Sequence, residues 1–181
     1  MCIRDRSLPA SLTGGRYRFS LGDFPLGDLT VIAPERTFTQ PELVQSIDAA
    51  FTTADGTPVA TLAGVALDPA TIPCAPAPEA TCSLPLVWRA DGEASVGYHA
   101  FVHLVDETGN ILAQSDAVPA GWTRPTTGWL PGEYVVDVHT LNLPNALPDG
   151  PLTLRVGLYD PVTGERLFAR DGIDAALVTL P

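Results

Sequence analysis

The chain has 181 residues, of which 45% are apolar and 17% charged, a balance that can bury a core and excludes a disordered tail. Its 21 acidic residues outnumber ten basic residues, all of them arginine, and the resulting net charge of -11 excludes a nucleic-acid-binding surface. Eighteen prolines and 16 glycines interrupt the chain at short intervals, which excludes long helices and indicates one main domain built of brief segments.

The N-terminal part differs from the rest of the chain. We expect residues 1–6 to be a non-native leader, and no long apolar run follows them, so neither a signal peptide nor a transmembrane segment is predicted. Residues 14–21 alternate polar and apolar side chains after a glycine, as a strand would. We interpret residues 7–50 as the tail and linker of a preceding domain, with a helical turn at 41–51. The complete domain is then expected over residues 51–181.

Two cysteines, Cys74 and Cys82, flank a seven-residue insert that contains Pro76 and Pro78. Their spacing is too wide for a metal knuckle, and neither a second cysteine pair nor a nearby histidine completes a zinc site. A disulfide fits the spacing better, with two unpaired thiols in a surface loop as the alternative. Such bridges persist outside the cytosol, so the pair points to an extracytoplasmic location.

Alternation of apolar and polar residues at period two recurs through the later part of the chain, between turn signals such as residues 106–110 and 160–164. Many short strands at this spacing predict an all-β fold. We expect an antiparallel β-sandwich of immunoglobulin-like or jelly-roll-like type, with few or no helices. Its core would take the inward-facing stripes, which include Val102, Leu104, Val136, Val138, Leu154, Val156 and Leu158.

Three residues are candidate metal ligands. Asp137 and His139 share one face of a predicted strand, and His103 would lie on a neighbouring strand, so the three side chains could converge on one ion. Imidazoles held by structural hydrogen bonds are the alternative. The turns at Asp106 and Asp160 could offer oxygens to calcium, but the twelve-residue ligand loop is missing and turn geometry explains them.

No recognisable catalytic constellation or cofactor motif occurs in the sequence. There is no Gly-x-Ser-x-Gly elbow, Ser115 adjoins an acid rather than a base, and no glycine-rich phosphate loop follows a strand. We therefore predict no cofactor and no enzyme activity. A carbohydrate-active hydrolase is the less favoured alternative, because its two carboxylates come from distant strands and leave no local pattern.

Trp122 and Trp129 bracket Arg124 in a long connection between strands. An aromatic side chain in such a connection could stack on a sugar ring, so these three residues form the candidate carbohydrate site. The alternative is that Trp129 closes one end of the sandwich while its indole N–H bonds to the backbone.

Four stretches form an ordered set that is recognisable as a whole: residues 98–116, 125–133, 137–139 and 157–167. With them, the region from residue 51 to the end resembles the β-sandwich domain appended to bacterial membrane glycosyltransferases that use polyprenyl-phosphate sugars. The cysteine-flanked insert departs from that pattern, and the sequence contains no transferase membrane core. The resemblance implies a position outside the membrane, in a larger membrane-anchored protein, and carries no transferase activity onto this chain.

Two functions follow as expectations. The first is a non-catalytic accessory module, whose partners would be a glycan and an upstream membrane glycosyltransferase. The second is a purely structural immunoglobulin-like spacer, with a tandem domain as its neighbour. The two differ in whether Trp122, Arg124 and Trp129 are exposed or packed.

Overall fold

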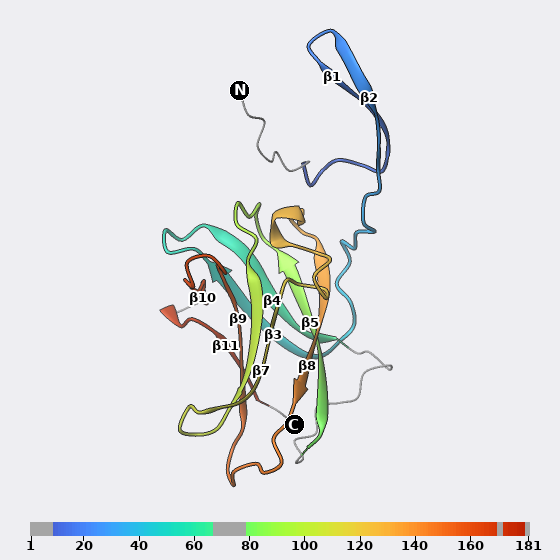
Figure 1. Ribbon diagram of the computed structural model, residues 1–181. Helices are drawn as coiled ribbons and strands as arrows, with labels where there is room; N and C mark the ends of the chain where they lie inside the picture. The colour runs from blue at the N-terminus through green and yellow to red at the C-terminus, as the bar shows by residue number, and fades with distance from the viewer. Residues whose placement is uncertain (1–8, 67–78, 170–171, 180–181) are drawn as a thin grey trace. The chain divides into compact units, whose positions relative to one another are not determined.

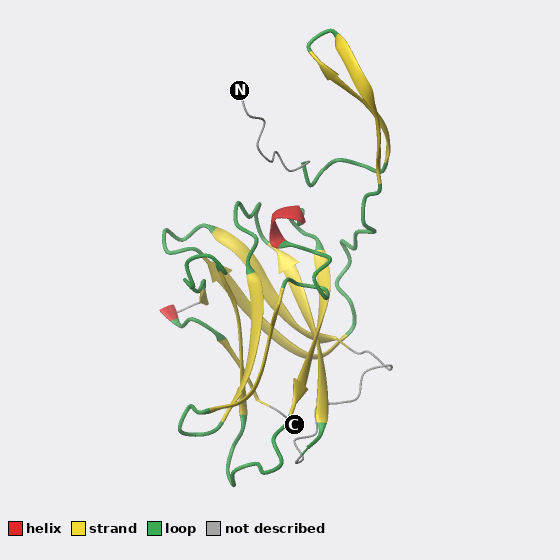
Figure 2. Ribbon diagram, in the orientation of Figure 1, coloured by secondary structure: helices red, strands yellow, loops and turns green. Residues whose placement is uncertain are grey.

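The computed structural model describes residues 9–66, 79–169 and 172–179, and the chain divides into two compact units, residues 1–36 and 37–181. Strands dominate both units, and no α-helix occurs in the part of the chain that the structure describes; η1 (Thr126–Gly128) is a single 3-10 turn. Figure 2 shows this dominance of strands directly. The all-β prediction is therefore confirmed.

The first unit contains a two-stranded antiparallel hairpin, β1 (Gly15–Leu21) and β2 (Phe24–Val31). Alternation in β1 places Tyr17, Phe19 and Leu21 on one face, and Arg16 on the other face pairs with Asp28 of β2 at 2.7 Å. The glycine-led alternation at residues 14–21 thus does form a strand.

The second unit is an antiparallel sandwich of two sheets (Figure 1). Among the described residues, one sheet runs in the order β10-β3-β4-β5-β8 and the other in the order β11-β9-β6-β7. The strands of the first sheet are β3 (Leu43–Thr52), β4 (Pro58–Ala66), β5 (Thr81–Ala90), β8 (Tyr134–Asn142) and β10 (Phe168–Ala169). The strands of the second sheet are β6 (His99–Val105), β7 (Ile111–Ala117), β9 (Thr153–Tyr159) and β11 (Ala176–Thr179).

The core lies between these two sheets. Its largest fully buried side chains include Trp88 of β5 and Phe51 of β3, whose rings meet edge to face at 5.7 Å. Opposite them, Leu104 and Leu154 are fully buried, as the period-two stripes of β6 and β9 predict. The predicted core residues on these two strands are therefore confirmed.

The predicted core residues of β8 are wrong. Val136 and Val138 are 41% and 46% exposed, because β8 turns its other face inward and buries Asp137 and His139 there. Both parities of this strand carry apolar residues, so alternation alone could not select the buried face. Hydrogen bonds to the two buried polar side chains, described below, make their burial possible.

The sandwich begins earlier than residue 51. β3 covers Leu43–Thr52, where a linker and a helical turn were expected, and it pairs with β4 inside the first sheet. Its alternation is broken by register shifts around Asp48, which has a left-handed φ of 56°. Gly64 faces this irregular stretch, and a Cβ there would lie 2.1 Å from the Gln45 carbonyl oxygen. The boundary between the units falls at Arg36 and Thr37.

Of the two cysteines, Cys82 lies in β5 and is 1% exposed, whereas Cys74 lies outside the described residues. The disulfide stays a prediction.

Candidate functional site

The connection between β7 and β8, residues 118–133, is here named the aromatic loop. It begins with a tight turn in which Ala120, Gly121 and Trp122 have left-handed φ angles of 55°, 60° and 71°. Backbone bonds close the turn, from the Trp122 N–H to the Val118 carbonyl and from the Arg124 N–H to the Pro119 carbonyl, each at 3.0 Å. This conformation suits Gly121 and strains the other two residues, a feature that clusters at functional sites.

Trp122 is 65% exposed at the end of this turn. Its ring makes an edge-to-face contact with the ring of His99 of β6. The two ring centroids are 5.2 Å apart, and the ring planes make an angle of 82°. His99 in turn contacts Tyr159, its cross-strand partner on β9, at 5.7 Å. These three side chains form the aromatic platform, on the face of the second sheet opposite the core.

Arg124 and Trp129, the other two candidate carbohydrate residues, are packed. Trp129 is 2% exposed, and its indole N–H donates to the Arg124 carbonyl oxygen at 2.9 Å. The Arg124 guanidinium pairs with the fully buried carboxylate of Glu133, which also accepts the Leu130 N–H at 2.9 Å. Of the three candidates, Trp122 is the one placed to touch a ligand, and the other two fix the loop that presents it.

A buried hydrogen-bond network supports the same loop from below. Asp137, 1% exposed, accepts the Ala120 backbone N–H at 2.8 Å, the Trp88 indole N–H at 3.3 Å and the His139 Nε2–H at 2.9 Å. Because the carboxylate is an acceptor, we assign the proton to His139 Nε2, which leaves Nδ1 to accept the Ser115 hydroxyl at 3.0 Å. Asp137 therefore joins the core tryptophan to the turn that carries Trp122.

Asp137, His139 and Ser115 are hydrogen-bonded in series, as the carboxylate, imidazole and hydroxyl of a serine-hydrolase triad are. Here, however, the imidazole and the carboxylate are each 1% exposed, and the carboxylate already holds the backbone of the aromatic loop. The arrangement ties β7 to β8 across the edge of the sandwich. Sequence reasoning missed the Ser115 contact, because the pattern within each strand does not show which strands meet edge to edge.

The structure does not bring the three candidate metal ligands together. Asp137 and His139 are hydrogen-bonded on the inner face of β8, whereas His103 lies on the outer face of β6 with its ring 4.9 Å from that of Phe101. Burial lowers the pKa of His103, although Asp116 at 4.0 Å opposes that effect. No group of three His, Cys, Asp or Glu side chains able to hold a metal ion occurs among the described residues.

The two turns considered for calcium are stabilised by their own hydrogen bonds. Asp106 accepts bonds from the side chains and backbones of Thr108 and Asn110, led by the Thr108 side chain, and these hold its pKa at about 2. Asp160 accepts the Val162 N–H at 2.8 Å. Turn geometry thus accounts for both, as the sequence predicts.

Comparison with known proteins gives no relative: no protein-family model matches the chain, and no curated protein or solved structure is similar to it. No helix among the described residues is long and apolar enough to span a membrane.

Proposed function

We propose that this chain is a non-catalytic module that binds carbohydrate through the aromatic platform. The observation that carries the proposal is Trp122, an exposed indole fixed on a strained, hydrogen-bonded turn and held against the ring of His99. An aromatic face of this size can stack on the apolar face of a sugar ring. Because the loop is already ordered, binding does not require the loss of entropy that ordering it would cost.

Polar groups for sugar hydroxyls lie beside the platform. Tyr159 of the platform also lines a cavity of about 290 Å³. The other lining residues are Phe101, Asp116, Gly164 and Arg166. Sugar recognition commonly combines a stacking surface with a few hydrogen-bonding groups that fix orientation. The Asp116 carboxylate and the Tyr159 hydroxyl supply such groups without any requirement for charge on the ligand.

The resemblance described above supports a setting for this binding. In that setting the module lies outside the membrane, as part of a larger membrane-anchored protein, and contacts the glycan handled by a neighbouring glycosyltransferase. A structural spacer is the second candidate, and the division of the chain into two units favours it, since a tandem array would show the same organisation.

Titration with a panel of bacterial glycans, followed by Trp fluorescence and NMR, tests the proposal. We expect saturable binding in the millimolar range, weakened at least about tenfold by Trp122→Ala, which corresponds to about 1.4 kcal/mol. Phe38→Ala is the matched control, because Phe38 is 56% exposed and does not belong to the platform.

Three outcomes would count against a non-catalytic module that binds carbohydrate at this site. Absence of binding at millimolar glycan would leave the spacer as the function. Binding that survives Trp122→Ala would show that the platform is not the site. Turnover of a sugar that depends on a carboxylate would show that the module is catalytic.

A further inference from the structure

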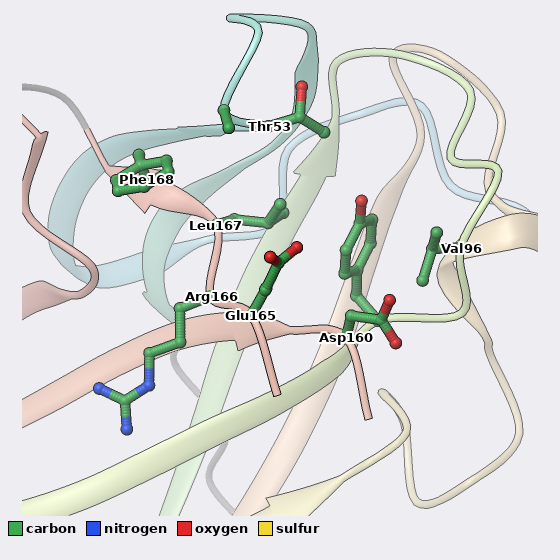
Figure 3. A pocket seen from close by; sticks show the side chains of 9 residues that line it. Thr53, Val96, Asp160, Glu165, Arg166, Leu167 and Phe168 are labelled. Atoms are coloured by element: carbon green, nitrogen blue, oxygen red, sulfur yellow. The ribbon is translucent and has the colours of Figure 1, made fainter. Parts of the chain in front are cut away.

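A second concave site lies at the end of the sandwich, where three connections meet. It is a cavity of about 370 Å³, here named the end cavity, and its lining includes Thr53, Val96, Tyr98, Asp160, Glu165 and Leu167. An adjoining space of about 430 Å³ shares Tyr98 and Glu165 and adds Asp55 and Glu93. Figure 3 shows how the turn after β9, which carries Asp160 and Glu165, faces Thr53 and Val96 across the end cavity.

Tyr98 is a buried polar side chain that this structure leaves without a partner. The residue is 7% exposed, and its hydroxyl makes no hydrogen bond among the described residues. Among the described residues, every side-chain nitrogen or oxygen that is fully buried has a hydrogen-bond partner. The Tyr98 hydroxyl has none, so it is not fully buried, and it opens into the cavity that Tyr98 lines. Its position is fixed, because the Tyr98 backbone N–H donates to the buried Thr126 hydroxyl at 2.9 Å.

Among the residues that the structure describes, the charge around this hydroxyl is negative and uncompensated. Glu165 makes no side-chain hydrogen bond or ion pair among the described residues, and Asp160 lies on the same turn. Arg166 also borders the cavity, but its guanidinium pairs with Asp174 at 2.6 Å and lies 4.3 Å from the centre of the Phe101 ring. Figure 3 shows its guanidinium directed away from Glu165 and Asp160. Burial, with the nearby Asp160 and Asp55 carboxylates, raises the pKa of Tyr98.

We infer that the end cavity binds an organic ammonium group, with the Tyr98 hydroxyl and the Glu165 and Asp160 carboxylates as its acceptors. An ammonium group has three N–H donors and carries the charge that the cavity lacks. Val96 and Leu167 provide apolar contact for the attached carbon skeleton. A bare divalent cation fits less well, because no metal-holding group of three carboxylate, imidazole or thiol side chains occurs among the described residues. This inference does not depend on carbohydrate binding at the aromatic platform.

The chemistry is shared by amino sugars and aliphatic amines, so the experiment uses one of each. NMR titration of the full chain with glucosamine and with n-butylamine, at low ionic strength, is compared with N-acetylglucosamine and 1-butanol as uncharged counterparts. We expect at least one of the two amines to shift the NMR signals of Tyr98 and Glu165, and neither uncharged compound to shift those signals, whether or not N-acetylglucosamine also binds at the platform. The amine that binds more tightly identifies the source of the ammonium group.

Four variants locate the binding. We expect Glu165→Gln and Tyr98→Phe each to weaken the amine about tenfold, the scale of a lost hydrogen bond to a charged group. Glu107→Gln removes the same charge from an exposed turn outside the cavity and should leave binding unchanged. Trp122→Ala should leave the amine-induced shifts at Tyr98 and Glu165 unchanged, which separates this site from the platform.

The inference is overturned if neither amine saturates at the end cavity, or if N-acetylglucosamine shifts the Tyr98 and Glu165 signals as strongly as glucosamine does. It is equally overturned if Glu107→Gln weakens the amine as much as Glu165→Gln does, because the attraction would then be the general field of an acidic protein. If calcium binds and its binding depends on Glu165 and Tyr98 in the same way, the end cavity is a metal-ion site and the ammonium inference is wrong.

Discussion

Trp122 and Trp129, seven residues apart in the same loop, have opposite environments: one indole is exposed and the other is 2% exposed. The sequence identifies both as candidates, because their residue type and their place in a connection are alike. What separates them is the backbone, left-handed at Trp122 and extended at Trp129. Residue type at a position does not report such dihedral angles, so a sequence pattern can single out the loop without showing which tryptophan is exposed.

Leu154 and Val136 provide a direct test of the two strand faces. Leu154 is fully buried between the sheets, so Leu154→Ala leaves a cavity and should lower the free energy of unfolding by about 2–5 kcal/mol. Val136 is 41% exposed, and Val136→Ala should cost less than about 1 kcal/mol. Urea denaturation of both variants checks the prediction. Equal losses would mean that β8 has been assigned the wrong inner face.

At the scale of the element, the aromatic loop is held at three points. These are the Asp137 bond to the Ala120 N–H, the Trp129 indole bond to the Arg124 carbonyl, and the Arg124 pair with buried Glu133. The sequence singles out Asp137, Arg124 and Trp129 as candidate ligand-binding residues, and in the structure each of them holds the aromatic loop in place. Their supporting role depends on contacts between distant elements, which no local spacing encodes.

Removing Asp137 should affect both stability and binding. Asp137→Ala deprives the Trp88 indole, the Ala120 N–H and His139 of their shared acceptor, and should lower the free energy of unfolding by about 3–5 kcal/mol. The same variant should broaden the NMR signals of the Trp122 ring and weaken glycan binding, because the turn loses its lower anchor.

Ser115→Ala is the control for that prediction, since it removes a single neutral bond to His139 and should cost about 0.5–1.5 kcal/mol without loosening the turn. An Asp137→Ala protein with unchanged stability and unchanged Trp122 signals would show that the loop does not depend on the buried carboxylate.

The strands themselves were largely predictable from the sequence, with one informative exception. The sequence predicts strands where β6 and β9 lie, because each carries an apolar residue at every second position, whereas it predicts a linker with a helical turn where β3 lies. The pairing of β3 with β4 changes register around Asp48, so the apolar residues of β3 do not recur at every second position. A search for period-two alternation therefore misses this strand.

At the scale of the whole molecule, the position of β3 fixes how much chain the sandwich needs. β3 lies between β10 and β4 in the first sheet, and its Phe51 packs against Trp88. We expect a protein of residues 37–181 to unfold cooperatively at the same urea concentration as the full chain. A protein of residues 51–181 lacks most of β3 and should show no cooperative transition. Far-UV circular dichroism in urea measures both, and a stable, cooperative 51–181 protein would contradict the boundary at Arg36 and Thr37.

The left-handed turn beneath Trp122 also bears on how far this protein could be stabilised. Glycine adopts such angles at no steric cost, whereas Ala120 and Trp122 hold them against their own preference. A more stable version of the turn would carry glycine at these positions and would thereby lose the indole at residue 122. If carbohydrate binding is the function, residue 122 therefore has two opposed requirements: glycine would make the turn more stable, and tryptophan is needed to contact the sugar. Selection for binding would then oppose evolution toward greater stability at this position.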